Sequence, residues 1–237
     1  MSIFYAGDTH GYLKHFHRIE TEALKEAHSA IVQVGDFGIL WPGGGKKMVS
    51  YFEKRTKRGI YTAPWYFCDG NHDNHDALDA LHAESDGSGV VEVAPNCFHV
   101  KRGTVLEIDG KSHIFCGGAK STDRQDGRGD FTKSGHRVWW PQEDPSREDL
   151  ELFNDNFNLH KPEVVVTHDA PYTVDIYRTG RFDDPTPRAF DMILRLSEHK
   201  PKLWLFGHHH IFKAYQVEEH EGIDFRCCGF HGQGWVF

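Results

Sequence analysis

The residues best suited to chemistry in this sequence are polar side chains that directly follow short apolar runs. Residues 203–206 are apolar, and Gly207, His208, His209 and His210 come next. If the apolar run is a buried strand, His208 and His210, two positions apart, point toward the same side of the turn. Neutral imidazole nitrogens are common ligands of divalent metal ions. This stretch is therefore predicted to contribute ligands to a metal site.

Four earlier apolar runs end in a similar way. Asp8 and His10 follow residues 3–6, Asp36 follows residues 30–34, Asn71 and His72 follow residues 65–68, and His168 follows residues 164–167. The carboxyl ends of strands at one edge of an α/β sheet are where such folds build their sites. Carboxylates, an amide oxygen and imidazoles together favour Mn, Fe, Zn or similar divalent ions. The set is too large for one four-coordinate ion, so a pair of ions is predicted.

The elements that must position these residues alternate between strand and helix. Apolar periodicity predicts helices at residues 15–28, 46–58, 77–81, 146–159 and 186–197, the last with Thr186 as N-cap and Pro187 as first residue. Short strands at residues 90–93, 98–100, 104–108 and 113–116 indicate an antiparallel middle section, and a last hairpin is expected at residues 213–217 and 225–228. This order predicts an α/β sandwich with mixed sheets, as a single domain over residues 1–237.

Composition excludes several classes of function. The 237 residues carry a formal net charge of −8 and no long basic run, which argues against a surface that binds duplex nucleic acid. No apolar run is long enough to span a membrane, and no signal-peptide pattern precedes the first strand, so a cytoplasmic location is expected. The five cysteines have no metal-ligand spacing and are expected to be small buried side chains.

Five short motifs follow one another at the predicted strand ends. They are Asp-x-His from residue 8, Gly-Asp from residue 35, Gly-Asn-His-Asp from residue 70, a lone His168 before a small residue, and Gly-His-x-His from residue 207. In this order, over residues 7–210, they resemble the calcineurin-like metallophosphoesterase superfamily. The resemblance implies a four-layer α/β/β/α sandwich with two mixed β-sheets.

The resemblance also implies a role for each motif residue. One metal ion would be held by Asp8, His10, Asp36 and His210, and the other by Asp36, Asn71, His168 and His208, with Asp36 bridging the two. His72 would face the substrate and donate a proton or a hydrogen bond to the leaving or a non-bridging oxygen, and His209 would point away. The cofactors would be two divalent ions among Mn, Fe, Zn, Ni and Mg, with Mn favoured.

The implied activity is hydrolysis of a phosphomonoester or phosphodiester by a hydroxide held between two cations. A nucleotide or another small substrate is favoured by the acidic net charge. The alternatives are a phosphoprotein Ser/Thr phosphatase and a catalytically silent metal-binding interaction module. The protein phosphatases of the superfamily carry Gly-Asp-x-x-Asp-Arg-Gly, whereas residues 35–41 here read Gly-Asp-Phe-Gly-Ile-Leu-Trp, and Asp73 replaces a Glu.

Residues 117–145 contain no clear periodic pattern, and a loop of this length is usually functional or covers a site. It contains Arg124, Arg128, His136 and Arg137, which are candidates to bind the substrate phosphate in place of the missing Arg. Near the end of the chain, His231 is a further histidine that could approach the site.

Overall fold

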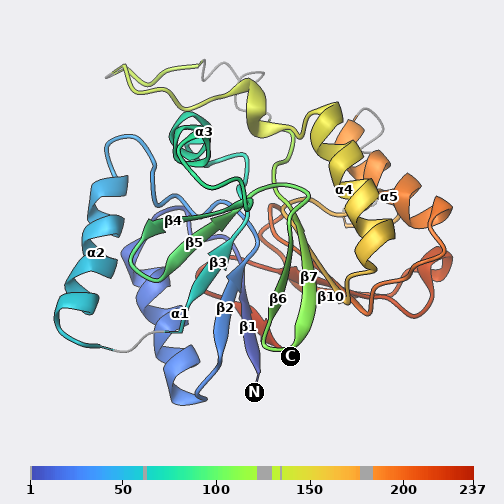
Figure 1. The fold of residues 1–237 in the computed structure, drawn as a ribbon, viewed down its shortest axis with the longest axis horizontal. Coiled ribbons are helices and arrows are strands. Elements are labelled where there is room, and N and C mark those ends of the chain that lie inside the picture. The colour runs from blue at the N-terminus through green and yellow to red at the C-terminus, as the bar shows by residue number, and fades with distance from the viewer. Residues whose placement is uncertain (1, 61–62, 122–129, 134, 177–183) are drawn as a thin grey trace.

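The strands form two six-stranded mixed sheets that pack face to face (Figure 1). The computed structural model describes residues 2–60, 63–121, 130–133, 135–176 and 184–237, and the strand counts refer to these residues. The first sheet has the order β12 (Gly234–Val236), β1 (Ile3–Ala6), β2 (Ala30–Gln33), β3 (Trp65–Phe67), β5 (Cys97–Val100) and β4 (Val90–Ala94). The second has the order β10 (Phe212–Tyr215), β11 (Asp224–Cys228), β9 (Leu203–Phe206), β8 (Val164–Thr167), β7 (Lys111–Cys116) and β6 (Val105–Ile108).

The inner strands of both sheets are parallel, which sets the position of the site. Strands β1, β2, β3 and β5 run parallel in the first sheet, and β7, β8, β9 and β11 run parallel in the second. Antiparallel strands occur only at the outer edges of the sheets as described: β12, β4, β10 and β6. The turns after β1, β2, β3, β8 and β9, which carry the predicted site residues, therefore share one end of the sandwich.

Helices cover the outer face of each sheet. They are α1 (Leu13–Lys25), α2 (Gly45–Lys57), α3 (His75–Ala83), α4 (Arg147–His160) and α5 (Pro185–Leu196), and short 3₁₀ turns lie at Pro141–Glu143 and Glu218–His220. Phe16 of α1 stacks on Trp65 of the first sheet, and Phe190 of α5 packs against Trp204 of the second. The arrangement confirms the predicted four-layer sandwich, in which helices form the outer layers and the sheets the inner ones (Figure 1).

A buried hydrogen bond crosses the largely apolar space between the sheets. The hydroxyl of Tyr5, on β1, lies 2.8 Å from Nε2 of His113, on β7, and Nδ1 of His113 lies 2.8 Å from the carbonyl oxygen of Lys111. The Nδ1–H group therefore donates to Lys111, and Nε2 accepts from the tyrosine hydroxyl. This pairing satisfies both polar groups and ties the two sheets together.

Several elements differ from the expectation. Helix α1 covers Leu13–Lys25 where residues 15–28 were predicted, and α3 covers His75–Ala83 where residues 77–81 were predicted. Helix α5 begins at Pro185 with Asp184 as N-cap, so the prediction of Thr186 and Pro187 as its first two positions is wrong by two residues. Both prolines fit because the first-turn amides of a helix have no intrahelical acceptor. Strand β12 was not expected, because it has only three residues and begins with a glycine. Gly234 packs tightly, since a Cβ atom there would overlap Tyr5 and Phe4.

Candidate metal centre

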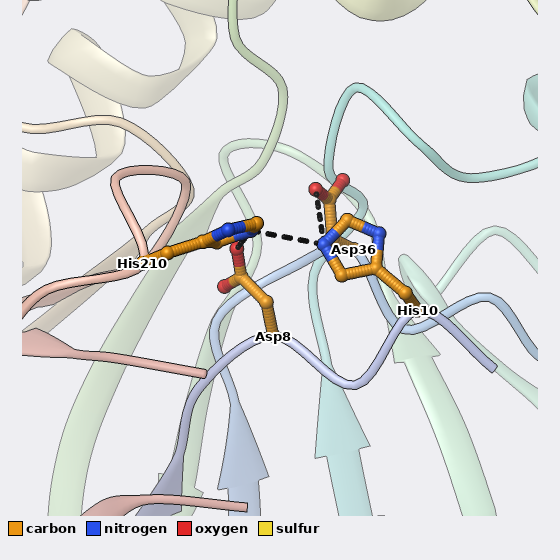
Figure 2. Close-up of side chains that lie close together, drawn as sticks. All are labelled: Asp8, His10, Asp36 and His210. Atoms are coloured by element: carbon orange, nitrogen blue, oxygen red, sulfur yellow. Dashed lines mark hydrogen bonds and ion pairs between the residues drawn. The ribbon is translucent and has the colours of Figure 1, made fainter. Parts of the chain in front are cut away.

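Four ligand-type side chains from three turns converge at the carboxyl end of the strands (Figure 2). Ligand atoms of Asp8, His10, Asp36 and His210 all lie within 4.8 Å of one another. Nε2 of His10 is 3.0 Å from Nε2 of His210 and 3.5 Å from Oδ2 of Asp36. Nε2 of His210 is 3.2 Å from Oδ2 of Asp8. Because metal–ligand distances of about 2.0–2.2 Å keep the ligands of one ion within roughly 4.4 Å of one another, this spacing is close to that of a coordinated cation.

A second group of ligand atoms adjoins the first through Asp36. Nε2 of His168 lies 3.3 Å from Oδ1 of Asp36 and 3.1 Å from Oδ1 of Asn71. Nδ1 of His208 lies 2.9 Å from the same amide oxygen. Asp36 thus turns Oδ2 toward His10 and Oδ1 toward His168. A carboxylate placed in this way has one oxygen for each of two neighbouring cations.

Neighbouring groups orient the ligand side chains. Nδ1 of His168 is 2.8 Å from the carbonyl oxygen of Val34 and donates to it, so Nε2, which faces Asp36 and Asn71, is the nitrogen that could bind a metal ion. Such a hydrogen bond from the second ring nitrogen is typical of metal-bound histidine. His209 is turned differently, because its Nε2 lies 2.9 Å from Oδ1 of Asp169.

Four of the candidate ligands have left-handed backbone conformations. The φ angles are 47° at His10, 54° at Asp36, 62° at His208 and 55° at His210. This region is uncommon outside glycine, although Asn, Asp and His adopt it more readily than other residues. Strained backbone of this kind persists where the surrounding structure determines it, and it clusters at functional sites.

The turns after β2 and β3 are held together by the buried carboxylate of Asp73. Its oxygens accept hydrogen bonds from the amides of Phe37 at 3.1 Å, Gly38 at 2.7 Å and Gly70 at 2.8 Å. Gly70 also lies so close to Asp36 that a Cβ atom would overlap its backbone and carboxylate. The Gly-Asn-His-Asp motif therefore supplies two things, the candidate ligand Asn71 and the Asp73 carboxylate that braces the two turns.

The protonation of the buried groups is compatible with cation binding. Burial lowers the pKa of His208 to about 3, so its ring is neutral and able to coordinate. Burial also lowers the pKa of His168, but the Asp36 carboxylate outweighs this effect and raises it to about 10. A proton on His168 compensates for the buried carboxylate of Asp36 when no other positive charge is near. A divalent cation would displace that proton and supply the compensating charge.

His72 lies at the edge of the ligand cluster. Its backbone amide donates to Oδ1 of Asp36 at 2.7 Å, which fixes the turn that carries it. Its ring lies 5.4 Å from the ring of His10 and 6.1 Å from that of Trp41, measured between centroids. The side chain is half-buried, so it can meet a molecule that enters from solvent.

The four residues considered for substrate binding have different surroundings. Arg124 and Arg128 lie outside the described residues. The guanidinium of Arg137 donates to the carboxylate of Asp76 at 2.9 Å and to the carbonyl oxygen of Trp139 at 3.0 Å. His136 is exposed and lines a groove beside Trp41.

The residue that the sequence interpretation missed is Phe230. Its ring contacts His10 at 5.3 Å and His210 at 4.6 Å between centroids. In the sequence, Phe230 lies in the turn of Gly229, Phe230, His231 and Gly232, where the histidine is the residue expected to approach the site. His231 itself lies beside the buried His15, with 2.9 Å between its Nδ1 and Nε2 of His15.

A family model described as calcineurin-like phosphoesterase matches residues 1–212. The chain therefore belongs to the calcineurin-like phosphoesterase family, and the resemblance inferred from the sequence is confirmed. The family acts on phosphoesters with metal ions, and the buried Asp and His cluster of this chain is consistent with that class. No curated protein matches the chain.

Solved structures support the same fold. The chain is 14% identical to the protein TT1561 of Thermus thermophilus, with 98% of this chain and 90% of that one covered and a TM-score of 0.56. It is also 14% identical to a putative 5′-nucleotidase from Staphylococcus aureus, solved in complex with alpha-ketoglutarate, with 98% of this chain and 49% of that one covered and a TM-score of 0.53. At this identity the likeness concerns the fold.

The cysteines and the lengths of the helices bear on two further expectations. All five cysteines are buried and unpaired, as predicted: Cys68, Cys97, Cys116, Cys227 and Cys228. In the described part of the chain, every helix is too short or too polar to cross a bilayer.

Proposed function

We propose that this protein is a dinuclear-metal phosphoester hydrolase that acts on a small phosphomonoester or phosphodiester, with residues 1–237 acting as one domain. The observation that carries the proposal is the shared carboxylate of Asp36, which faces His10 and its neighbours on one side and His168 on the other. In the proposed assignment one ion is held by Asp8, His10, Asp36 and His210, and the other by Asp36, Asn71, His168 and His208. Manganese is the favoured ion because the ligands mix hard oxygens with imidazoles.

The bound cations would supply Lewis acidity for the phosphoryl oxygens and lower the pKa of an attacking water. The remaining chemistry falls to His72, which is not a ligand in this assignment. Its ring would donate a proton to the ester oxygen as the bond between phosphorus and that oxygen breaks and the oxygen of water bonds to phosphorus. The products are an alcohol and a phosphate or phosphomonoester. A positioned general acid contributes typically about 10²–10⁴-fold to such a rate.

A phosphoprotein phosphatase is the less favoured hydrolase. The segment after Asp36 has Phe37, Gly38 and Ile39 where the protein phosphatases carry a motif with Asp and Arg, and Phe37 and Ile39 are buried in the core. A silent binding module is disfavoured because each predicted ligand and His72 are present in the sequence.

Hydrolysis of p-nitrophenyl phosphate and bis-p-nitrophenyl phosphate by the manganese-loaded protein tests the proposal. Turnover that is abolished by a chelator and restored by manganese is expected for at least one of the two esters. Faster turnover of the monoester identifies a phosphatase and faster turnover of the diester a phosphodiesterase. A protein that binds manganese but hydrolyses neither ester would be a binding module, and the proposal would be wrong.

A further inference from the structure

A groove of about 770 Å³ lies beside the candidate metal centre. Its lining includes Trp41 and Pro42 from the loop before α2, Val49 from α2 itself, and His136. Its volume is in the range of small-molecule sites, and most of its lining is apolar. Lys46 and Glu53 also line it, so the charged side chains of the groove cancel formally.

The groove connects with the site through Trp41. The indole ring of Trp41 lies 6.1 Å from the imidazole of His72, in an edge-to-face arrangement, and 5.6 Å from the ring of Trp140. Trp140 is fully buried and so fixes the position of Trp41, which is itself only half-buried. A group bonded to the oxygen that His72 protonates would therefore meet the indole ring of Trp41 next.

A second ring, that of His136, also lines the groove. His136 is exposed, and its Nε2 lies 3.6 Å from the position that a Cβ atom on Gly43 would occupy. Gly43 has a φ of 81°, so a glycine suits this position, and the ring of His136 lies against its bare backbone. Two ring side chains in the lining of an apolar groove suit a flat aromatic occupant, because every aromatic ring has a π-face to stack.

We infer that this groove binds the leaving group of the substrate, and that the preferred leaving group is an alcohol that carries a planar, uncharged aromatic ring. The inference rests on the proposed function and adds the substrate class. In the reaction, the bond between phosphorus and the oxygen of this alcohol breaks, His72 gives a proton to that oxygen, and the oxygen of water bonds to phosphorus. The released alcohol leaves through the groove. Trp41 and His136 determine specificity and take no part in the chemical step.

The test compares benzyl phosphate with propyl phosphate, or their methyl diesters if the diester is preferred. Both leaving groups are primary alcohols, and the intrinsic reactivity of each ester cancels when a variant is compared with the wild type on the same ester. We expect the wild type to prefer the benzyl ester in kcat/KM. Trp41→Leu and His136→Ala should each lower kcat/KM for the benzyl ester on the order of tenfold more than for the propyl ester.

Controls separate the inference from the proposed function. Lys133→Ala changes an exposed residue of the same loop that does not line the groove, and it should leave the preference between the two esters as it is in the wild type. Metal content should equal that of the wild type in all variants. If both esters are hydrolysed but Trp41→Leu and His136→Ala slow them equally, the inference is wrong and the hydrolase remains. If the metal-loaded wild type hydrolyses neither these esters nor the p-nitrophenyl esters, the proposed function itself fails.

Discussion

The ring of Phe230 stacks on the imidazole of His210, with centroids 4.6 Å apart and planes inclined by 12°. The same ring meets His10 edge-on at 82°. The turn that carries Phe230 is attached to the ligand turn, because the amide of Asp8 donates to the carbonyl oxygen of Gly229 at 3.2 Å. Phe230 is therefore a positioning residue for the imidazoles of His10 and His210, although it has no donor atom of its own.

Replacing Phe230 should weaken metal binding without removing a ligand. Aromatic contacts of this kind contribute about 0.5–1.5 kcal/mol, so Phe230→Leu is expected to lower manganese affinity about fivefold. Phe230→Tyr should retain most of the affinity because the ring is kept. The measurement is calorimetric titration of the metal-free protein with manganese.

Phe98→Leu is the matched control for this change. Phe98 of β5 stacks on Tyr66 of β3 at 5.5 Å, and neither ring contacts a candidate ligand in the contacts described above. Phe98→Leu should lower the free energy of unfolding about as much as Phe230→Leu does, and it should leave manganese affinity as in the wild type. Equal affinities for Phe230→Leu and the wild type would show that the stacked ring has no positioning role.

Asp36→Asn should remove metal from both positions. The carboxylate of Asp36 faces both groups of ligands, and an amide has neither the charge nor the second anionic oxygen needed to bridge two cations. Elemental analysis after dialysis would measure the loss. Asp224→Asn, which removes a carboxylate paired with Arg226 on β11, should keep the full metal content. A fully loaded Asp36→Asn protein would contradict the bridging role.

His72→Ala should keep both metals and lose most of its turnover. The backbone amide of His72 donates to Asp36, and truncating the ring leaves that hydrogen bond intact. We expect kcat to fall about 10²–10⁴-fold, as for loss of a general acid. His17→Ala, which truncates an exposed histidine on α1, serves as the control. If metal were lost along with activity, His72 would have to be reassigned as a ligand.

Because His113 is buried, the folded protein is expected to lose stability in acid. Burial lowers its pKa to about 4, whereas an unfolded histidine has a pKa of about 6.5. Between these values the unfolded chain binds more protons than the folded one, so the free energy of unfolding decreases as the pH falls from about 6.5 to about 4. The contribution lost in this window is on the order of 3 kcal/mol.

Urea unfolding of the metal-free protein between pH 7 and pH 4.5 would measure this contribution by difference. His113→Gln keeps a donor and an acceptor between Tyr5 and Lys111 but does not titrate. We expect the variant to show a shallower decrease in acid than the wild type, and parallel decreases would show that His113 does not titrate as predicted.

The ligand turns could be located from the sequence because their signal is local. Each consists of an apolar run, a glycine or short turn, and a polar residue, and parallel strands bring such ends together whatever the intervening chain contains. Contacts that depend on packing gave no such signal. The stacking of Phe230 on His210 depends on where β11 ends, and the approach of Trp41 to His72 depends on the support of Trp140. The start of α5 was misplaced because two prolines, at 185 and 187, fit a first turn equally well.

The pairing of β12 with β1 places the two ends of the chain side by side. The amide of Ile3 donates to the carbonyl oxygen of Phe237 at 2.8 Å, and the amide of Phe237 donates to that of Ile3 at 3.2 Å. The marked N and C ends accordingly lie close together (Figure 1). These residues lie at the end of the strands opposite the ligand turns. A short linker could thus join the termini, and new ends could be opened in a surface loop, with the ligand geometry kept. Reporter proteins fused at either terminus would likewise project from the end of the sandwich opposite the turns that carry the candidate ligands.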